Sequence, residues 1–146
     1  MTAMTTTLWL RISSVITLLF AAGHSLGGLK YWSPMGENAV LQAMRSVRFD
    51  IMGVSRSYLD FYMAFGYSLS VIQVMLAILL WQLAAVARIN AASVRPMIAA
   101  ITLAVAASAV IAWRFILPVP ALFSLVQLAS LAVGFVVARQ PSASAT

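Results

Sequence analysis

Four long runs of this chain contain no Asp, Glu, Lys or Arg. They cover residues 12–29, 61–87, 96–113 and 115–138. Each run is close to or longer than the roughly 18 residues at which an uncharged apolar stretch indicates a membrane-spanning helix. The sequence therefore predicts an all-α fold: an integral membrane protein built as an antiparallel bundle of four helices.

The composition supports this prediction. Of the 146 residues, 63% are hydrophobic and 8% are charged, whereas about a quarter of the residues of an ordinary soluble domain are charged. A chain of this length still exposes roughly a third of the area of its unfolded form, so it cannot hide this much apolar side chain in its own core. The excess apolar surface must face lipid.

Turn-forming residues divide the chain between the runs. Asn90 and the pair Arg95-Pro96 separate the second helix from the third, and Pro118 and Pro120 make the third connection so short that helices three and four must form an antiparallel hairpin. We therefore expect one domain, residues 1–139, followed by a small polar tail, 140–146, that is disordered. The expected helices are about 8–29, 57–87, 95–114 and 119–138.

The first connection, from about residue 30 to 56, is the long one. It contains Glu37 and Asp50, and the third acidic residue of the chain, Asp60, follows it directly. Within the segment 37–52, apolar residues recur at the spacing of one helical face (Val40, Met44, Val47 and Ile51). This pattern predicts a short helix that lies at the membrane interface between helices one and two.

Antiparallel connectivity brings this connection to the same side of the membrane as the end of helix one and the start of helix two. His24, the chain's one histidine, lies near the end of the first helix, and Asp60 opens the second. Ionisable groups at membrane depth suggest function, and a carboxylate beside an imidazole orients it and raises its basicity. His24 and Asp60 are therefore the candidate catalytic pair, and Glu37 is a weaker candidate acid or base.

Structural roles for the same residues stay open. His24 also fits an interfacial histidine that is hydrogen-bonded to a neighbouring helix, and Asp60 fits a helical partner of Arg56. Glu37 fits the acidic first turn of the interfacial helix.

Basic and aromatic residues gather at the same end. Arg45 or Arg48 is suited to hold the anionic end of a ligand, and the aromatic side chains would hold its apolar body. Anchoring to lipid headgroups and an aromatic belt at the interface are the simpler readings of these residue types. The predicted binding residues are Arg45, Arg48, Arg56, Trp32, Tyr62, Tyr67, Trp113 and Gln127.

Several chemistries are excluded by residue counts. The chain has no Cys, one His and three acidic residues, so disulfides, thiolate catalysis, bis-histidine haem and carboxylate-bridged metal pairs are not possible. We expect no metal and no cofactor. The net charge of +6 comes from nine scattered Lys and Arg residues that form no nucleic-acid motif, so the expected partners are membrane lipids.

Short motifs add a resemblance. Gly23-His24-Ser25, Trp32-Ser33-Pro34, the stretch 56–62 and Phe65-Gly66 together resemble a group of small bacterial four-helix membrane proteins, broadly DoxX-like in layout. The resemblance implies a multi-pass protein of the bacterial inner membrane and implies no activity. The positions that carry it are His24, Trp32, Pro34, Arg56, Asp60, Tyr62 and Gly66.

Three functions stay open at this stage. The first is binding of a small lipophilic molecule in a lipid-accessible pocket at this end of the bundle. The second is a membrane-embedded isomerase, cyclase or epoxide-opening enzyme that uses His24 and Asp60 as acid and base. The third is a structural subunit whose small-residue face, Ala100, Ala104 and Ala107, packs on another protein; a homo-oligomer is also possible.

Overall fold

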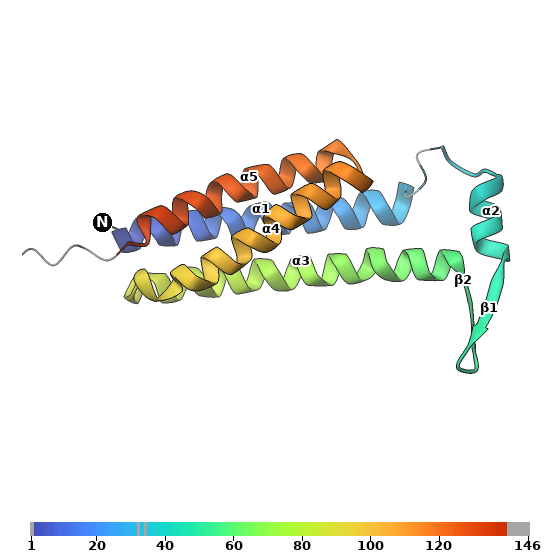
Figure 1. Cartoon of the computed structure of the whole chain (residues 1–146), viewed down its shortest axis with the longest axis horizontal. Helices are drawn as coiled ribbons and strands as arrows, with labels where there is room; N and C mark the ends of the chain where they lie inside the picture. The colour runs from blue at the N-terminus through green and yellow to red at the C-terminus, as the bar shows by residue number, and fades with distance from the viewer. Residues whose placement is uncertain (1, 32, 34, 140–146) are drawn as a thin grey trace, which may run out of the picture. The chain divides into compact units, whose positions relative to one another are not determined.

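The structure is a computed structural model that describes residues 2–31, 33 and 35–139. Trp32, Pro34 and the predicted disordered tail, 140–146, lie outside the described residues. In chain order the elements are α1 (Thr2–Tyr31), α2 (Ala39–Ser46), β1 (Arg48–Ile51), β2 (Val54–Ser57), α3 (Tyr58–Ile89), the short 3-10 helix η1 (Ala92–Val94), α4 (Arg95–Phe115) and α5 (Pro118–Val137) (Figure 1).

Four of these helices, α1, α3, α4 and α5, are long and apolar enough to cross a membrane. The predicted all-α, four-helix membrane fold with an additional short helix is confirmed, and the chain is a multi-pass membrane protein. With 21 and 20 residues, α4 and α5 match a hydrocarbon core of about 30 Å. With 30 and 32 residues, α1 and α3 exceed that thickness, so each must tilt or extend beyond it.

Two compact units make up the chain, and each is described by itself. One, which we call the bundle unit, comprises Met1–Phe20 and Met75–Thr146. The other, which we call the hairpin unit, comprises Ala21–Val74.

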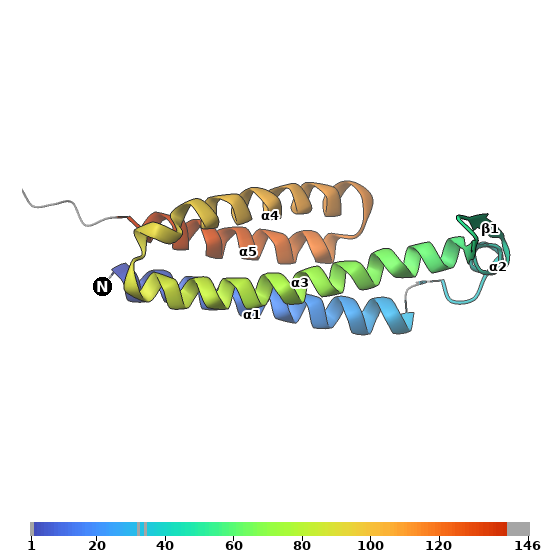
Figure 2. The ribbon, with the colours of Figure 1, turned by 90° about the horizontal axis from the view of Figure 1, so that it is seen from below.

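The core of the bundle unit is formed by the first part of α1, the second half of α3, and the antiparallel pair α4 and α5. Figure 2 shows α4 and α5 side by side, joined by the short connection that the prolines predict. The hydrophobic core draws on all four helices and on the connection between α3 and α4: Leu10, Leu80, Ala84, Ala87, Ala91, Val94, Ile98, Val105, Leu131 and Ala138.

Helix α1 presents small polar side chains to both of its neighbours in this unit. Ser13 Oγ donates a 2.8 Å hydrogen bond to Ser130 Oγ of α5, and Ser130 Oγ donates in turn to the Trp9 carbonyl. Gln127 Nε2 donates to Thr17 Oγ1 at 2.6 Å. Such bonds join helices in lipid, where water cannot satisfy buried polar groups.

The contact between α1 and α3 uses backbone acceptors. Thr7 Oγ1 donates to the Ala84 carbonyl at 3.1 Å, and Ser14 Oγ donates to the Ala77 carbonyl at 2.6 Å. Both acceptors are alanines that are at least 96% buried, and small side chains of this kind let two helix backbones approach closely. Residue numbers rise along α1 while the numbers of the hydrogen-bonded partners fall along α3, so the two helices run antiparallel.

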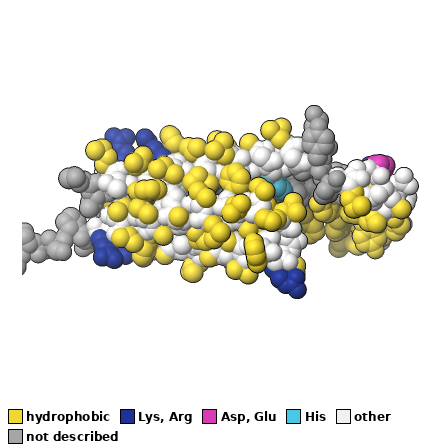
Figure 3. Space-filling view, turned by 90° about the horizontal axis from the view of Figure 1, so that it is seen from above, with side chains coloured by type: hydrophobic (Ala, Val, Ile, Leu, Met, Phe, Trp, Pro, Cys, Tyr) yellow, Lys and Arg dark blue, Asp and Glu magenta, His cyan; other side chains and the backbone are white. Residues whose placement is uncertain are grey.

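Most of the outward surface is apolar. The visible face in Figure 3 is covered mainly by hydrophobic side chains, with Lys and Arg toward the ends of the helices. Leu103, Val110 and Phe65 are each more than two-thirds exposed in the isolated chain. Side chains of this type at such exposure are suited to lipid rather than water.

The hairpin unit corrects one prediction. The expected interfacial helix 37–52 ends at Ser46, and residues 48–57 form an antiparallel β-hairpin that pairs Arg48 with Ser57 and Ile51 with Val54. Its turn residues, Met52 and Gly53, have φ values of 53° and 78°, the positive values that a two-residue hairpin turn requires.

Of the four residues of the predicted apolar face, Val40 and Met44 lie in α2, and Val47 and Ile51 lie beyond its end. Within α2 the buried residue is Leu41, while Val40 is 70% exposed. The Asn38 side chain caps the helix by accepting from the Leu41 amide at 3.0 Å, which fixes where the helix begins.

Candidate functional site

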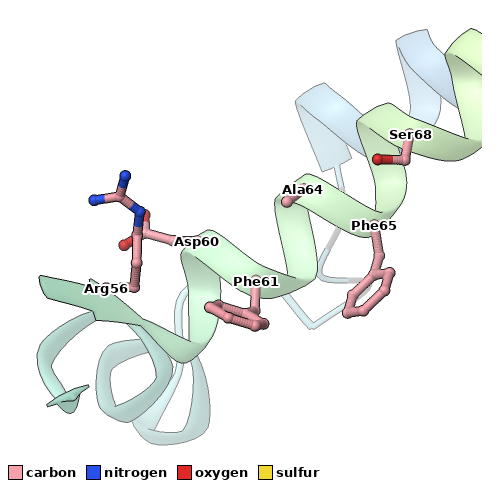
Figure 4. Close-up of a pocket in the computed structure, with 6 residues that line it drawn as sticks. All are labelled: Arg56, Asp60, Phe61, Ala64, Phe65 and Ser68. Carbon is pink, nitrogen blue, oxygen red and sulfur yellow. The ribbon is translucent and has the colours of Figure 1, made fainter. Parts of the chain in front are cut away.

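A groove lies on the first turns of α3, within the hairpin unit. One part has a volume of about 230 Å³ and is lined by Arg56, Asp60, Phe61, Ala64, Phe65 and Ser68 (Figure 4). A second part, about 480 Å³, is lined by Arg48, Arg56, Asp60, Met63, Ala64 and Tyr67. Because the two parts share Arg56, Asp60 and Ala64, we treat them together as the α3 groove.

The period of the helix explains the shape of the α3 groove. Residues three and four apart lie on one side of a helix, so Phe61 and Phe65 stand one turn apart, as Figure 4 shows. Between and beside the rings, Ala64 and Ser68 are small and leave the hollow open. The charged residues lie at the start of α3, so the α3 groove is polar at one end and apolar along the helix.

Asp60 fixes the start of α3 through a reciprocal pair of hydrogen bonds. Its Oδ2 accepts from the Ser57 amide at 2.8 Å, and the Ser57 hydroxyl accepts from the Asp60 amide at 3.2 Å. This is a capping box, in which two otherwise unpaired amides at a helix start are satisfied by side chains. Within the described residues, the ion pair shorter than 4 Å is Arg45–Glu37, so Asp60 acts as a cap and not as an ion-pair partner of Arg56.

Two arginines converge at the polar end of the α3 groove. Arg48 Nη2 and Arg56 Nη1 donate to the same acceptor, the Ser55 carbonyl oxygen, at 3.1 and 2.9 Å. Arg48 Nε also donates to the Ser55 hydroxyl at 3.2 Å. Two guanidinium groups are therefore held side by side on the β-hairpin. Their positive charges also lie close enough to Asp60 to attract it.

His24 is held by a different part of α3. Its Nε2 lies 3.2 Å from the Gly66 carbonyl oxygen, and because a carbonyl can only accept, Nε2 carries the hydrogen. Gly66 is six residues beyond Asp60, a rise of about 9 Å along a helix. The structure thus brings His24 to Gly66, the structural role that the sequence left open, and brings Asp60 to Ser57.

Next to His24, the same two helices are joined by a second polar contact. Ser25 Oγ donates to Ser70 Oγ at 2.9 Å, and the Ser70 hydroxyl also reaches the Gly66 carbonyl at 3.3 Å. The interface between α1 and α3 in the hairpin unit is therefore polar, and His24 belongs to it.

Of the predicted site residues, the structure brings Arg48, Arg56, Asp60 and Tyr67 together in the α3 groove. Glu37 and Arg45 lie elsewhere and pair with each other at 3.2 Å, with both side chains more than half exposed. Tyr62 is half exposed and does not line the groove.

Two further predicted residues, Trp113 and Gln127, belong to the bundle unit. The Trp113 side chain is 78% exposed, and Gln127 is buried against Thr17. Trp32 lies outside the described residues.

Sequence reasoning missed the apolar lining. Phe61, Ala64 and Phe65 follow the acidic first turn of α3 at helical spacing, and this spacing is the signal that could have found them. Phe49 of the β-hairpin packs on the same region, with its ring centroid 5.2 Å from that of Tyr58 and 5.3 Å from that of Phe61. These edge-on contacts hold Phe61 and attach the hairpin to α3.

No metal-ligating chemistry is assembled in the part of the chain that the structure describes, where no group of three His, Asp or Glu side chains is close enough to hold an ion. No family model, curated protein or solved structure matches the chain. The DoxX-like resemblance therefore stays a prediction.

Proposed function

We propose that the chain binds a small lipophilic molecule with an anionic end in the α3 groove, within the bacterial inner membrane. The observation that carries the proposal is the convergence of Arg48 and Arg56 on the Ser55 carbonyl, at the polar end of a groove whose other lining is largely apolar.

The two guanidinium groups suit a shared anion. Each presents planar N–H donors that match a carboxylate or phosphate, and hydrogen bonds between ionised groups are about twice as strong as neutral ones. Holding two like charges together is unfavourable unless an anion lies near both. Asp60 supplies part of this compensation, although its Oδ2 is already used by the helix cap, and a ligand anion would supply the rest.

The apolar lining suits the body of the same ligand. Phe61, Ala64 and Phe65 continue along α3 away from the charges, so a molecule with one polar end meets matching surface along its length. Small-molecule pockets occupy roughly 300–1,000 Å³; one part of the α3 groove, about 230 Å³, lies just below this range, and the other, about 480 Å³, lies in its lower half. A ligand the size of a short isoprenoid or fatty acid therefore fits better than a whole phospholipid.

Access from the bilayer follows from the position of the α3 groove. It opens on a helix that is long and apolar enough to span the membrane, and Phe65 is 74% exposed in the isolated chain. A lipophilic molecule dissolved in the membrane can reach such a surface without crossing water.

The acid–base alternative needs His24 and Asp60 at one reacting molecule. Hydrogen bonds to Gly66 and Ser57 occupy these two side chains at different heights on α3. Binding is therefore the function that the geometry supports best.

The proposal predicts that a ligand depends on Arg48 and Arg56. Native mass spectrometry of the protein purified from host membranes should show a small lipophilic adduct, and the double change R48Q/R56Q should reduce its occupancy at least tenfold. Each lost charge-assisted hydrogen bond is worth roughly 1.5–3 kcal/mol, and about 1.4 kcal/mol is a factor of ten in affinity.

The matched control is R45Q, which removes a charge from the same unit but outside the α3 groove. This variant should keep the adduct. An adduct lost equally in R45Q, or a wild-type protein that carries a second protein at fixed stoichiometry and no small molecule, would contradict the proposal; the latter would favour the structural-subunit alternative.

A further inference from the structure

A second feature of the molecule concerns the charge of the bundle unit. All three acidic residues of the chain, Glu37, Asp50 and Asp60, lie in the hairpin unit. The bundle unit carries five arginines: Arg11, Arg88, Arg95, Arg114 and Arg139. Its own sequence therefore offers no carboxylate side chain to compensate any of them.

Arg11 is the arginine placed deepest in a spanning helix. It is the tenth residue of α1, so it lies about 13 Å along the helix from the first residue. Its guanidinium carbon lies 4.8 Å from the ring centroid of Trp81 on α3, a cation–π contact. Its Nε atom is buried and has no hydrogen-bond partner. A half-buried charge in lipid needs a counter-ion, and none comes from the bundle unit.

A groove of about 300 Å³ begins beside this contact. It is lined by Ser14, Leu18, Ala77, Ile78, Trp81 and Gln82, which all belong to the bundle unit. Ser14 lies one turn beyond Arg11 on α1, and its hydroxyl is committed to the Ala77 carbonyl. We call this the Trp81 groove.

The antiparallel arrangement of α1 and α3 gives the Trp81 groove a direction. The α1 segment from Arg11 to Leu18 lies alongside the α3 segment from Gln82 back to Ala77. The cation, the indole and the amide are thus at one end, and leucine, isoleucine and alanine are at the other. A charged end followed by an apolar channel is the pattern of a phospholipid headgroup and its first acyl carbons.

We propose that the Trp81 groove binds an anionic phospholipid, whose phosphate is held by Arg11 and whose acyl chain lies along Leu18 and Ile78. The choice of an anionic lipid rests on charge. A zwitterionic headgroup would bring an ammonium group to an end of the bundle unit that carries four arginines (Arg11, Arg88, Arg95 and Arg139) and no carboxylate side chain, whereas an anionic headgroup brings net negative charge to it. This site is separate from the α3 groove and does not depend on the proposed function.

The test compares two lipids on delipidated protein in detergent. Native mass spectrometry during titration with phosphatidylglycerol or phosphatidylethanolamine of the same acyl chains gives the two affinities. We expect phosphatidylglycerol to bind at least about tenfold more tightly, and R11Q to remove most of that preference because it deletes the charge that faces the phosphate.

The matched control is R114Q. Arg114 also lies over an aromatic ring, that of Phe115 at 5.2 Å, and is exposed in the last turn of α4 outside the Trp81 groove. R114Q should leave the lipid preference within about twofold, because an exposed charge outside the groove contributes little. R11K, which retains the charge, guards against a folding defect and should bind phosphatidylglycerol more tightly than R11Q. Equal binding of the two lipids by wild type, or equal loss in R114Q and R11Q, overturns the proposal.

Discussion

Replacing Leu80 by alanine is expected to destabilise the bundle unit by about 2–5 kcal/mol, the range measured when a buried leucine is truncated. Leu80 is completely buried and belongs to the core that α1, α3, α4 and α5 share. Lipid does not refill a cavity inside a packed bundle, so the lost van der Waals contacts are not replaced.

The neighbouring residue supplies the control. Leu79 is 43% exposed and lies outside the core, so L79A exchanges protein-to-lipid contacts for similar ones and should change stability by less than about 1 kcal/mol. Reversible unfolding of both variants in mixed detergent micelles measures the difference. Equal destabilisation by L79A and L80A would mean that α3 does not present the face to the core that this structure shows.

The second large effect is expected from Ser130→Leu. The Ser130 hydroxyl accepts from Ser13 and donates to the Trp9 carbonyl at the interface of α1 and α5, and the side chain is 3% exposed. Leucine removes both hydrogen bonds and adds volume where there is no room. Overpacking costs about 1–3 kcal/mol, and each interhelical hydrogen bond in a membrane adds roughly 0.6 kcal/mol, so we expect a loss of about 3 kcal/mol.

Ser130→Ala separates the two contributions. It removes the hydrogen bonds without adding volume, so it should cost only about 1 kcal/mol. Thermal unfolding followed by circular dichroism, with both variants in the same detergent, measures the two losses. If S130L is as stable as S130A, α1 and α5 are not packed against each other at this position.

The long uncharged runs predicted the four spanning helices because the bilayer imposes one strong rule: an apolar stretch that must satisfy its own backbone becomes a helix. The helix ends were predicted less well. The expected first helix began at about residue 8, whereas α1 begins at Thr2, because a helix continues past the apolar run wherever its residues tolerate helical geometry.

The β-hairpin was missed because its segment fits two periods. Residues 40, 44, 47 and 51 have helical spacing, but Val47, Phe49 and Ile51 also alternate with Arg48 and Asp50. The two-residue turn at Gly53 favours the strand period over the helical one, since glycine tolerates the positive φ that a tight hairpin needs. The apolar alternation and the glycine together were the stronger signal.

The candidate site was only partly predictable. Connectivity and charge identified Arg48, Arg56, Asp60 and Tyr67 as neighbours, and the structure places all four in the α3 groove. The use of Asp60 as a helix cap depends on Ser57 three residues earlier, a local pattern visible in the sequence. The partner of His24 is a backbone carbonyl, and no side-chain pattern can indicate which carbonyl that is.

A further sequence signal lies in α3. Ser70, Ala77 and Ala84 recur every seven residues, and a seven-residue repeat keeps one face of a helix toward its neighbour. All three positions contact polar side chains of α1: Ser70 with Ser25, Ala77 with Ser14 and Ala84 with Thr7. The repeat therefore marks the face of α3 that packs on α1.

The number of membrane crossings is the claim on which the whole account depends, and single-cysteine labelling tests it most directly. The chain has no native cysteine, so a single cysteine at an exposed position in or directly next to each connection (Met35, Ile89 or Ile116) reports alone to a membrane-impermeant maleimide. Four crossings predict that Met35→Cys and Ile116→Cys label from one side of sealed vesicles and Ile89→Cys from the other. Labelling of all three from the same side would contradict the four-helix topology.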